Sequence, residues 1–97
     1  MVPFTMSSVK PTVTVQRKMT ISSRANVSIT CSATGHPRPI VKWEKLRAGS
    51  NLYLTSNPVL HLHNLTVNAS GTYQCTASNT GGNTSAKSTL LVQGKSN

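Results

Sequence analysis

The stretch Gly71-Thr72-Tyr73-Gln74-Cys75-Thr76-Ala77-Ser78 decides the fold class, because its apolar and polar residues alternate. In an extended chain, Tyr73, Cys75 and Ala77 share one face and the polar residues share the other. The same period of two recurs along the chain, with the apolar members Val13 and Val15; Val27, Ile29 and Cys31; Val41 and Trp43; Leu60 and Leu62; Leu90 and Val92. No helical spacing of apolar residues is sustained, so the pattern predicts half-buried antiparallel strands.

Clusters of turn-forming residues separate these runs and set the architecture. They are rich in Gly, Pro, Asn and Ser and lie at residues 22–24, 35–39, 48–51, 56–58 and 80–83. A chain of 97 residues is the length of one domain. The spacing predicts roughly six to eight short strands, folded as an all-β two-sheet sandwich or a small barrel.

The composition excludes most catalytic chemistry. The formal net charge is +9, and Glu44 is the sole acidic residue. One carboxylate cannot form a paired-carboxylate hydrolase site or a carboxylate-rich calcium site, and no Gly-rich phosphate loop is present. His61 and His63 stand two residues apart and could share a metal, but the sequence shows no third ligand. We therefore expect no enzyme activity, no metal and no cofactor, and two exposed histidines.

The two cysteines, Cys31 and Cys75, each fall on the apolar face of their own predicted strand. Oxidised, they would link two sheets through the core and stabilise the fold by roughly 4 kcal/mol in the chain-entropy model. Reduced, they would be two buried thiols. They do not make a structural zinc site, which takes four ligands.

The chain resembles the immunoglobulin superfamily, and within it the intermediate set. The resemblance rests on the order Cys31, Trp43, Tyr73, Cys75 and on the stretches 32–43, 60–65, 71–79 and 90–92. It implies a two-sheet antiparallel immunoglobulin-like sandwich with one inter-sheet disulfide between Cys31 and Cys75, packed on Trp43. The Tyr73 hydroxyl would bond to backbone at the preceding turn. The core would also include Leu60, Leu62 and Leu65.

Two local features follow from the same resemblance. The chain between Trp43 and Leu60 is too short for the extra strand pair of a variable domain, so a single short strand is expected at 52–54, in the C′ or D position. The family usually has Asp where this chain has Ala69. Asn68 or Ser70 is expected to cap that turn instead.

Residues 6–93 are expected to form the immunoglobulin-like domain. Residues 1–5 show neither a strand pattern nor a signal-peptide pattern, and we interpret them as vector-derived. Residues 94–97 are interpreted as a tail or linker. The chain is thus expected to be one domain taken from a longer protein.

Two surface features bear on partners. Four cations group around the predicted strand at 40–45, namely Arg38, Lys42, Lys45 and Arg47. They favour either binding of a polyanion, such as a sulfated glycosaminoglycan, or a solvated face without a ligand. No aromatic residue interleaves them, so sequence-specific nucleic-acid binding is not expected. Four sequons are candidates for N-glycosylation, at Asn26, Asn64, Asn68 and Asn83. Because Ser and Thr are abundant in this chain, some sequons also arise by chance.

Two functions are compatible with these features. The first is a non-catalytic extracellular binding or adhesion module of a larger cell-surface or secreted protein. It would recognise a protein ligand, a homophilic immunoglobulin partner or a glycan, without inserting into the membrane. The second is an intracellular structural immunoglobulin domain of a muscle or actin-associated cytoskeletal protein, with reduced cysteines. The cysteines, the sequons and the all-β scaffold favour the first.

Overall fold

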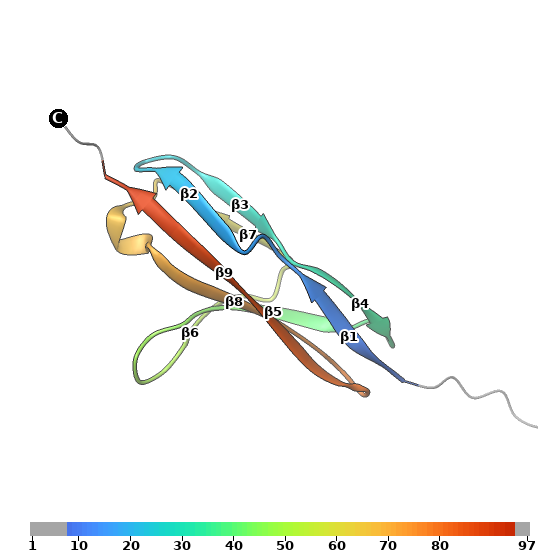
Figure 1. Cartoon of the computed structure of the whole chain (residues 1–97). Coiled ribbons are helices and arrows are strands. Elements are labelled where there is room, and N and C mark those ends of the chain that lie inside the picture. The colour runs from blue at the N-terminus through green and yellow to red at the C-terminus, as the bar shows by residue number, and fades with distance from the viewer. Residues whose placement is uncertain (1–7, 95–97) are drawn as a thin grey trace, which may run out of the picture.

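The computed structural model describes residues 8–94, and the expectations for residues 1–7 and 95–97 lie outside this range. Within it the chain forms nine strands and one short 3-10 helix, η1 (Figure 1). Their bounds are β1 Val9–Thr14, β2 Lys18–Ser22, β3 Val27–Thr30, β4 Ser32–His36, β5 Ile40–Lys45, β6 Leu52–Thr55, β7 Val59–Leu62, η1 Val67–Ala69, β8 Gly71–Asn79 and β9 Gly82–Gln93. Nine strands are more than the six to eight expected, because two stretches that the sequence treats as single strands are each divided in two. The first is divided into β1 and β2, and the second into β3 and β4.

The strands pack as two layers, which Figure 1 shows face to face. One layer is a five-stranded sheet in the order β2-β9-β8-β5-β6, in which β2 runs parallel to β9. The other consists of the pairs β1–β4 and β3–β7, joined because only Cys31 separates β3 from β4. β6 pairs with β5, so the short expected strand takes the C′ position. The predicted all-β sandwich is confirmed.

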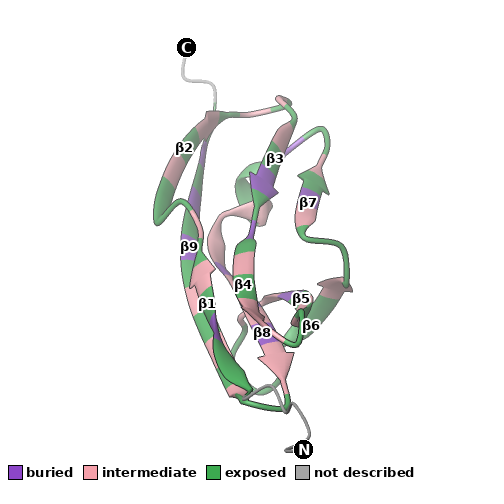
Figure 2. Cartoon of the chain, turned by 90° about the vertical axis from the view of Figure 1, so that its right-hand side faces the viewer, coloured by how far each residue is buried: buried purple, intermediate pink, exposed green. Residues whose placement is uncertain are grey.

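The core lies between the layers. Ile29, Trp43 and Cys75 are 0% exposed, and along β9 buried residues alternate with exposed ones (Figure 2). The disulfide between Cys31 and Cys75 joins the layers across a Cα–Cα distance of 6.4 Å. Trp43 lies beside Cys75 in the β5–β8 ladder, and its Nε1 donates a hydrogen bond of 3.0 Å to the Pro58 carbonyl oxygen. The predicted disulfide and the burial of Trp43 are both confirmed.

The strand register follows the alternation in the sequence with one difference. The expected core residues Ile29, Leu60, Tyr73 and Leu90 are buried, and Lys42, His61 and His63 are exposed. Val27 and Leu62, also expected to be buried, are half-buried and pack against the edge of the core. They face each other at the terminal pair of the β3–β7 ladder, where the sandwich ends and solvent reaches both side chains.

Candidate functional site

The four cations that the sequence groups around β5 do not meet in one place. Arg38 precedes β5 and Arg47 follows it, so the length of that strand, about 17 Å from its first to its last residue, lies between them. Lys42 lies on the outer face of the sheet, and its Nζ is 3.8 Å from Glu44 Oε2. The sole acidic side chain of the sequence therefore partly offsets the charge of Lys42. Polyanion binding through these four residues stays a prediction, and their positions do not favour it.

Lys45 does not belong to the outward basic surface, which corrects the sequence-based expectation. Along β5 it falls on the same side as Val41 and Trp43, and it is half-buried. Its Nζ donates a hydrogen bond of 3.0 Å to the Asn68 carbonyl oxygen and lies 5.5 Å from the centroid of the Tyr73 ring. A Cβ at residue 71, which is Gly with a φ of +150°, would lie 3.2 Å from Lys45 Cε. Lys45 thus fixes the turn before β8.

The turn before β8 is stabilised without the carboxylate that related domains place at position 69. The Tyr73 hydroxyl donates a hydrogen bond of 2.6 Å to the Ala69 carbonyl oxygen, as the family resemblance implied. Burial raises the pKa of this hydroxyl above its ordinary value. Ser70 is the C-cap residue of η1, and its backbone amide donates a hydrogen bond of 3.0 Å to the Val67 carbonyl oxygen. Its Oγ accepts a hydrogen bond of 2.8 Å from the Val92 amide, so the side chain ties the turn to β9.

The four sequon asparagines, Asn26, Asn64, Asn68 and Asn83, are all exposed. Asn26 and Asn64 are in contact, because Asn26 Oδ1 accepts a hydrogen bond of 2.9 Å from the Asn64 amide. The Asn26 amide nitrogen, which is the atom that a glycan would modify, has no part in that bond. The exposure of these asparagines is compatible with N-glycosylation, which stays a prediction.

His61 on the outer face of β7 and His63, which follows the end of that strand, lie side by side. Their ring centroids are 6.4 Å apart with an interplanar angle of 14°, and His61 Nδ1 is 2.9 Å from Ser28 Oγ. Among residues 8–94, no group of three or more His, Cys, Asp or Glu side chains is placed to hold a metal ion. In the same range, no helix has both the length and the apolar character that a membrane span requires.

The outer face of the five-stranded sheet carries an exposed apolar surface that sequence analysis did not single out. Ile40 at the start of β5 is 76% exposed, and Tyr53 in β6 is 56% exposed. Both line a hollow of about 600 Å³, together with Pro39, Lys42, Thr76 and Ser78. The Tyr53 hydroxyl is hydrogen-bonded to Ser56 Oγ at 2.5 Å, which orients the ring. The alternation of β5 already placed Ile40 outward, opposite Val41 and Trp43.

Ile40 separates this hollow from a second one of about 430 Å³, which Arg38 and Asn79 line. Asn79 holds the adjoining loops in place. Its Nδ2 donates hydrogen bonds of 2.7 Å to the Val9 carbonyl oxygen and 2.9 Å to the Pro37 carbonyl oxygen. Its Oδ1 accepts one of 2.7 Å from the Gly81 amide. The loop that leads into Ile40 is therefore built on a fixed frame.

Comparisons with known proteins agree with this architecture. A family model described as an immunoglobulin domain matches residues 10–79. Hemicentin-1 of Mus musculus is 41% identical over 86 residues, which cover 84% of this chain and 2% of that protein. Hemicentin-1 of Homo sapiens is 39% identical over 85 residues, which cover 82% of this chain and 2% of that protein. The chain thus spans about 2% of the length of these curated relatives.

Solved structures give the same answer. A structure of the N-terminal eight Ig domains of Down Syndrome Cell Adhesion Molecule superposes with a TM-score of 0.75 and 26% identity, covering 91% of this chain and 13% of that one. Titin domain M7 superposes with a TM-score of 0.73 and 28% identity, covering 92% of this chain and 99% of that one. With the family match and the inter-sheet disulfide, these likenesses show that the chain belongs to the immunoglobulin domain family.

Proposed function

We propose that this chain is a non-catalytic, extracellular protein-recognition module of a larger adhesion protein or receptor. Its partner binds the outer face around Ile40 and Tyr53. The observation that carries the proposal is the exposure of these two side chains, 76% and 56%, beside a hollow of about 600 Å³. Apolar and aromatic side chains gathered on a surface are typical of the centre of a protein interface.

The extracellular location is supported by covalent chemistry. A structural disulfide such as that between Cys31 and Cys75 persists in oxidising compartments and is rare in the cytosol. The exposure of all four sequon asparagines suits a secreted surface. A related structure is that of a cell adhesion molecule, which agrees with this location.

The charge around the apolar surface indicates the kind of partner. Arg38 lines the hollow on one side of Ile40 and has no ion-pair partner among the described residues. Lys42 lines the hollow on the other side, where Glu44 partly offsets its charge. The chain carries a net charge of +9, so two copies repel each other and a homophilic partner is disfavoured. The face fits a different protein that presents an apolar side chain surrounded by acidic residues.

The likeness to titin domain M7 favours a second candidate, an intracellular structural domain. In that case the cysteines would be reduced in the cell and the sequons unmodified. The exposed Ile40 and Tyr53 would then contact a neighbouring domain of the same protein. The chemical state of Cys31 and Cys75 in the native protein separates the two candidates.

A screen with matched variants tests the recognition face. The disulfide-bonded domain, displayed as a multimer to gain avidity, is applied to a panel of purified ectodomains. Ile40→Lys should weaken binding to the partner at least about tenfold, because a charge enters the apolar centre of the interface. Leu91→Lys is the control, since Leu91 is 43% exposed in β9, two strands away from β5. Equal loss from both variants would contradict the proposed face.

A further inference from the structure

We propose that Arg17, Lys18 and Lys87 form a second binding site, which takes the sulfate groups of a linear sulfated polysaccharide. The site lies where β2 runs beside β9, two strands away from β5. The inference rests on the extracellular location proposed above, because that is where such polysaccharides occur. It is independent of the face around Ile40.

The parallel pairing of β2 with β9 brings the three cations together. Lys18 lies opposite Thr89 in that ladder, and Lys87 precedes Thr89 by two residues on the same outward face of β9. With strands about 4.8 Å apart and a rise of about 3.3 Å per residue, the Cα atoms of Lys18 and Lys87 are roughly 8 Å apart. The Thr89 amide donates a hydrogen bond of 2.8 Å to the Arg17 carbonyl oxygen. All three cations thus stand on backbone fixed to β9.

The structure also provides a recess for a ligand group. Arg17 and Lys87 line one hollow of about 500 Å³, which is completed by Val13, Thr14, Val15 and Ala86. Arg17, Lys18 and Lys87 are all exposed, so their charged ends are free to close on an anion. A sulfate group entering this hollow would meet Arg17, which directly precedes β2, and Lys87 of β9. Lys18, the next residue after Arg17, would supply the third cation.

Among residues 8–94, no acidic side chain is paired with these cations. Glu44 is the only acidic residue of the chain, and it is the partner of Lys42. In the ladder register, Gln74 lies between Glu44 and Lys87. The site therefore differs from the group around β5, where Lys42 is paired with Glu44 and Lys45 is committed to the turn before β8.

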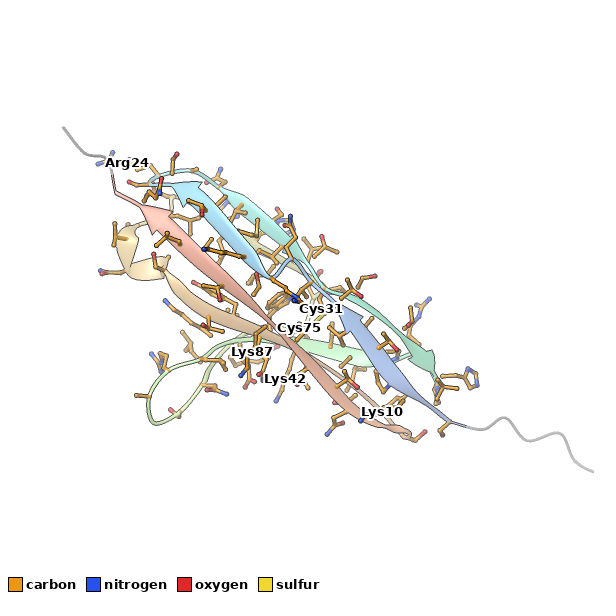
Figure 3. The ribbon with its side chains drawn as sticks, viewed as in Figure 1. Lys10, Arg24, Cys31, Lys42, Cys75 and Lys87 are labelled. Atoms are coloured by element: carbon orange, nitrogen blue, oxygen red, sulfur yellow. A yellow bond between two sulfur atoms is a disulfide. The ribbon has the colours of Figure 1, made fainter. Side chains whose placement is uncertain are left out.

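The arrangement favours a linear polyanion over a single small ion. Figure 3 shows Lys10, Lys87 and Arg24 spaced along the course of β9, with Lys10 near its first residues and Arg24 beyond its last. The side chain of Lys10 packs close to Gly82, since a Cβ there would lie 3.4 Å from Lys10 Cγ. These cations come from β1, from β9 and from the turn between β2 and β3, and their spacing beside β9 matches repeated sulfates along a sugar chain. Nucleic acid fits less well, because the exposed Tyr53 lies on β6, at the opposite edge of the sheet.

Two triple variants of equal charge test the site. The site variant removes the three proposed cations and carries Arg17→Gln, Lys18→Gln and Lys87→Gln. The control variant removes the same charge elsewhere and carries Arg38→Gln, Lys42→Gln and Arg47→Gln. The probe is a size-defined heparin oligosaccharide, titrated between low and physiological salt. The site variant should bind roughly tenfold more weakly than the control at low salt. Its slope of log K against log salt should be smaller by about 2, because three contacts no longer release counterions.

Three results would overturn the site. Equal loss in the two triple variants would mean diffuse charge. The two variants can also be compared by the salt concentration at which each elutes from a heparin column and from a sulfopropyl cation exchanger. The same difference in elution on both columns would mean simple ion exchange. Single-stranded DNA of the same charge binding as tightly as heparin would remove the assignment to sulfated sugars. Ile40→Lys should not weaken heparin binding, because Ile40 lies outside the proposed polysaccharide site. The two proposals can therefore fail independently, one by loss of the predicted heparin result and the other by loss of the predicted protein-binding result.

A footprint on the unaltered protein gives a test that needs no variant. Lysines are acetylated with and without the heparin oligosaccharide, and the modified peptides are measured by mass spectrometry. Lys18 and Lys87 should be protected by bound heparin, and Lys42 should react equally in both conditions. Protection of Lys42 to the same degree as Lys18 and Lys87 would contradict the site.

Discussion

Lys45 Nζ lies 3.0 Å from the carbonyl oxygen of Asn68, so a lysine of β5 holds the turn that leads into β8. The same ammonium group lies over the ring of Tyr73, whose hydroxyl bonds to the next carbonyl, that of Ala69. The turn is therefore fixed by two donors acting on consecutive backbone carbonyl oxygens. These two contacts take the place of the Asp side chain that the family resemblance implies at position 69, where this chain has Ala.

Replacing Lys45 should destabilise the fold although it is a half-buried lysine. Lys45→Met keeps the aliphatic stem and removes both the charged hydrogen bond and the cation–π contact, at a cost of about 1–2 kcal/mol. The control is Lys42→Met, whose side chain is 51% exposed and which should change stability by less than about 0.5 kcal/mol. Urea unfolding with the disulfide intact measures both. Equal, small effects would show that the Lys45 contact does not hold the turn.

Removing the Tyr73 hydroxyl should lower the free energy of unfolding at neutral pH and change how that free energy depends on pH above about 10. Tyr73→Phe loses the bond to the Ala69 carbonyl oxygen, at about 1 kcal/mol. Burial raises the pKa of Tyr73 in the folded state, so the folded chain holds this proton more tightly than the unfolded chain does. The resulting stability is fully present below the ordinary tyrosine pKa of about 10 and is lost as pH rises through the higher folded value.

Stability measured from pH 8 to pH 11 checks this sign. The wild-type protein should lose stability more steeply above about pH 10 than Tyr73→Phe does. Tyr53→Phe, at a 56% exposed position, should follow the wild-type profile. Parallel profiles for the wild-type and Tyr73→Phe proteins would contradict the assignment of the effect to Tyr73.

Ser88 offers a substitution that should stabilise the fold. Its side chain is 0% exposed, and its hydroxyl oxygen has no hydrogen-bond partner among the described residues. A buried hydroxyl without a partner costs free energy, so Ser88→Ala should raise stability by up to about 1 kcal/mol. Thermal unfolding of the two proteins gives the comparison. A loss of more than about 1 kcal/mol would mean that the hydroxyl has a partner in solution.

Trp43 should be among the most costly positions of the core. It is fully buried beside the disulfide. Trp43→Ala leaves a large cavity and removes one of the two hydrogen bonds to the Pro58 carbonyl oxygen, which keeps the bond from the Cys31 amide. The expected cost is about 3–5 kcal/mol, enough to unfold much of the population. Leu91→Ala at an exposed position is the matched control. A folded Trp43→Ala protein with nearly unchanged urea midpoint would contradict the packing described here.

The sandwich and most of the strand register could be predicted from the sequence, because alternation with period two assigns each side chain to one face. The disulfide could be predicted only from the family resemblance, since alternation alone left two buried thiols as an alternative. The same rule placed Ile40 outward, but only the structure shows that Tyr53 and two hollows border it. Lys45 was misplaced because it was grouped with the cations near it in sequence, although the alternation of β5 puts it on the same side as Val41 and Trp43. Its contact depends on the position of Asn68, which is remote in sequence.

The basic site beside β9 could not be found by scanning local sequence. Lys18 and Lys87 are far apart in the chain, and their proximity depends on the parallel pairing of β2 with β9. Nothing in the composition distinguishes these cations from Arg38 and Arg47, which the chain separates. Likewise, the three bonds made by Asn79 depend on how the loops meet at one end of the sandwich.

The state of Cys31 and Cys75 in the native parent protein tests the central claim most directly. Protein taken from its source tissue is alkylated without reductant, digested and analysed by mass spectrometry, with and without glycosidase treatment. The extracellular assignment predicts a linked Cys31–Cys75 peptide pair, two hydrogens lighter than the reduced peptides, and a glycosidase-dependent mass change at one or more of the four sequon asparagines. Alkylation of both cysteines before reduction, with all four asparagines unmodified, would contradict it and assign the domain to the intracellular structural class.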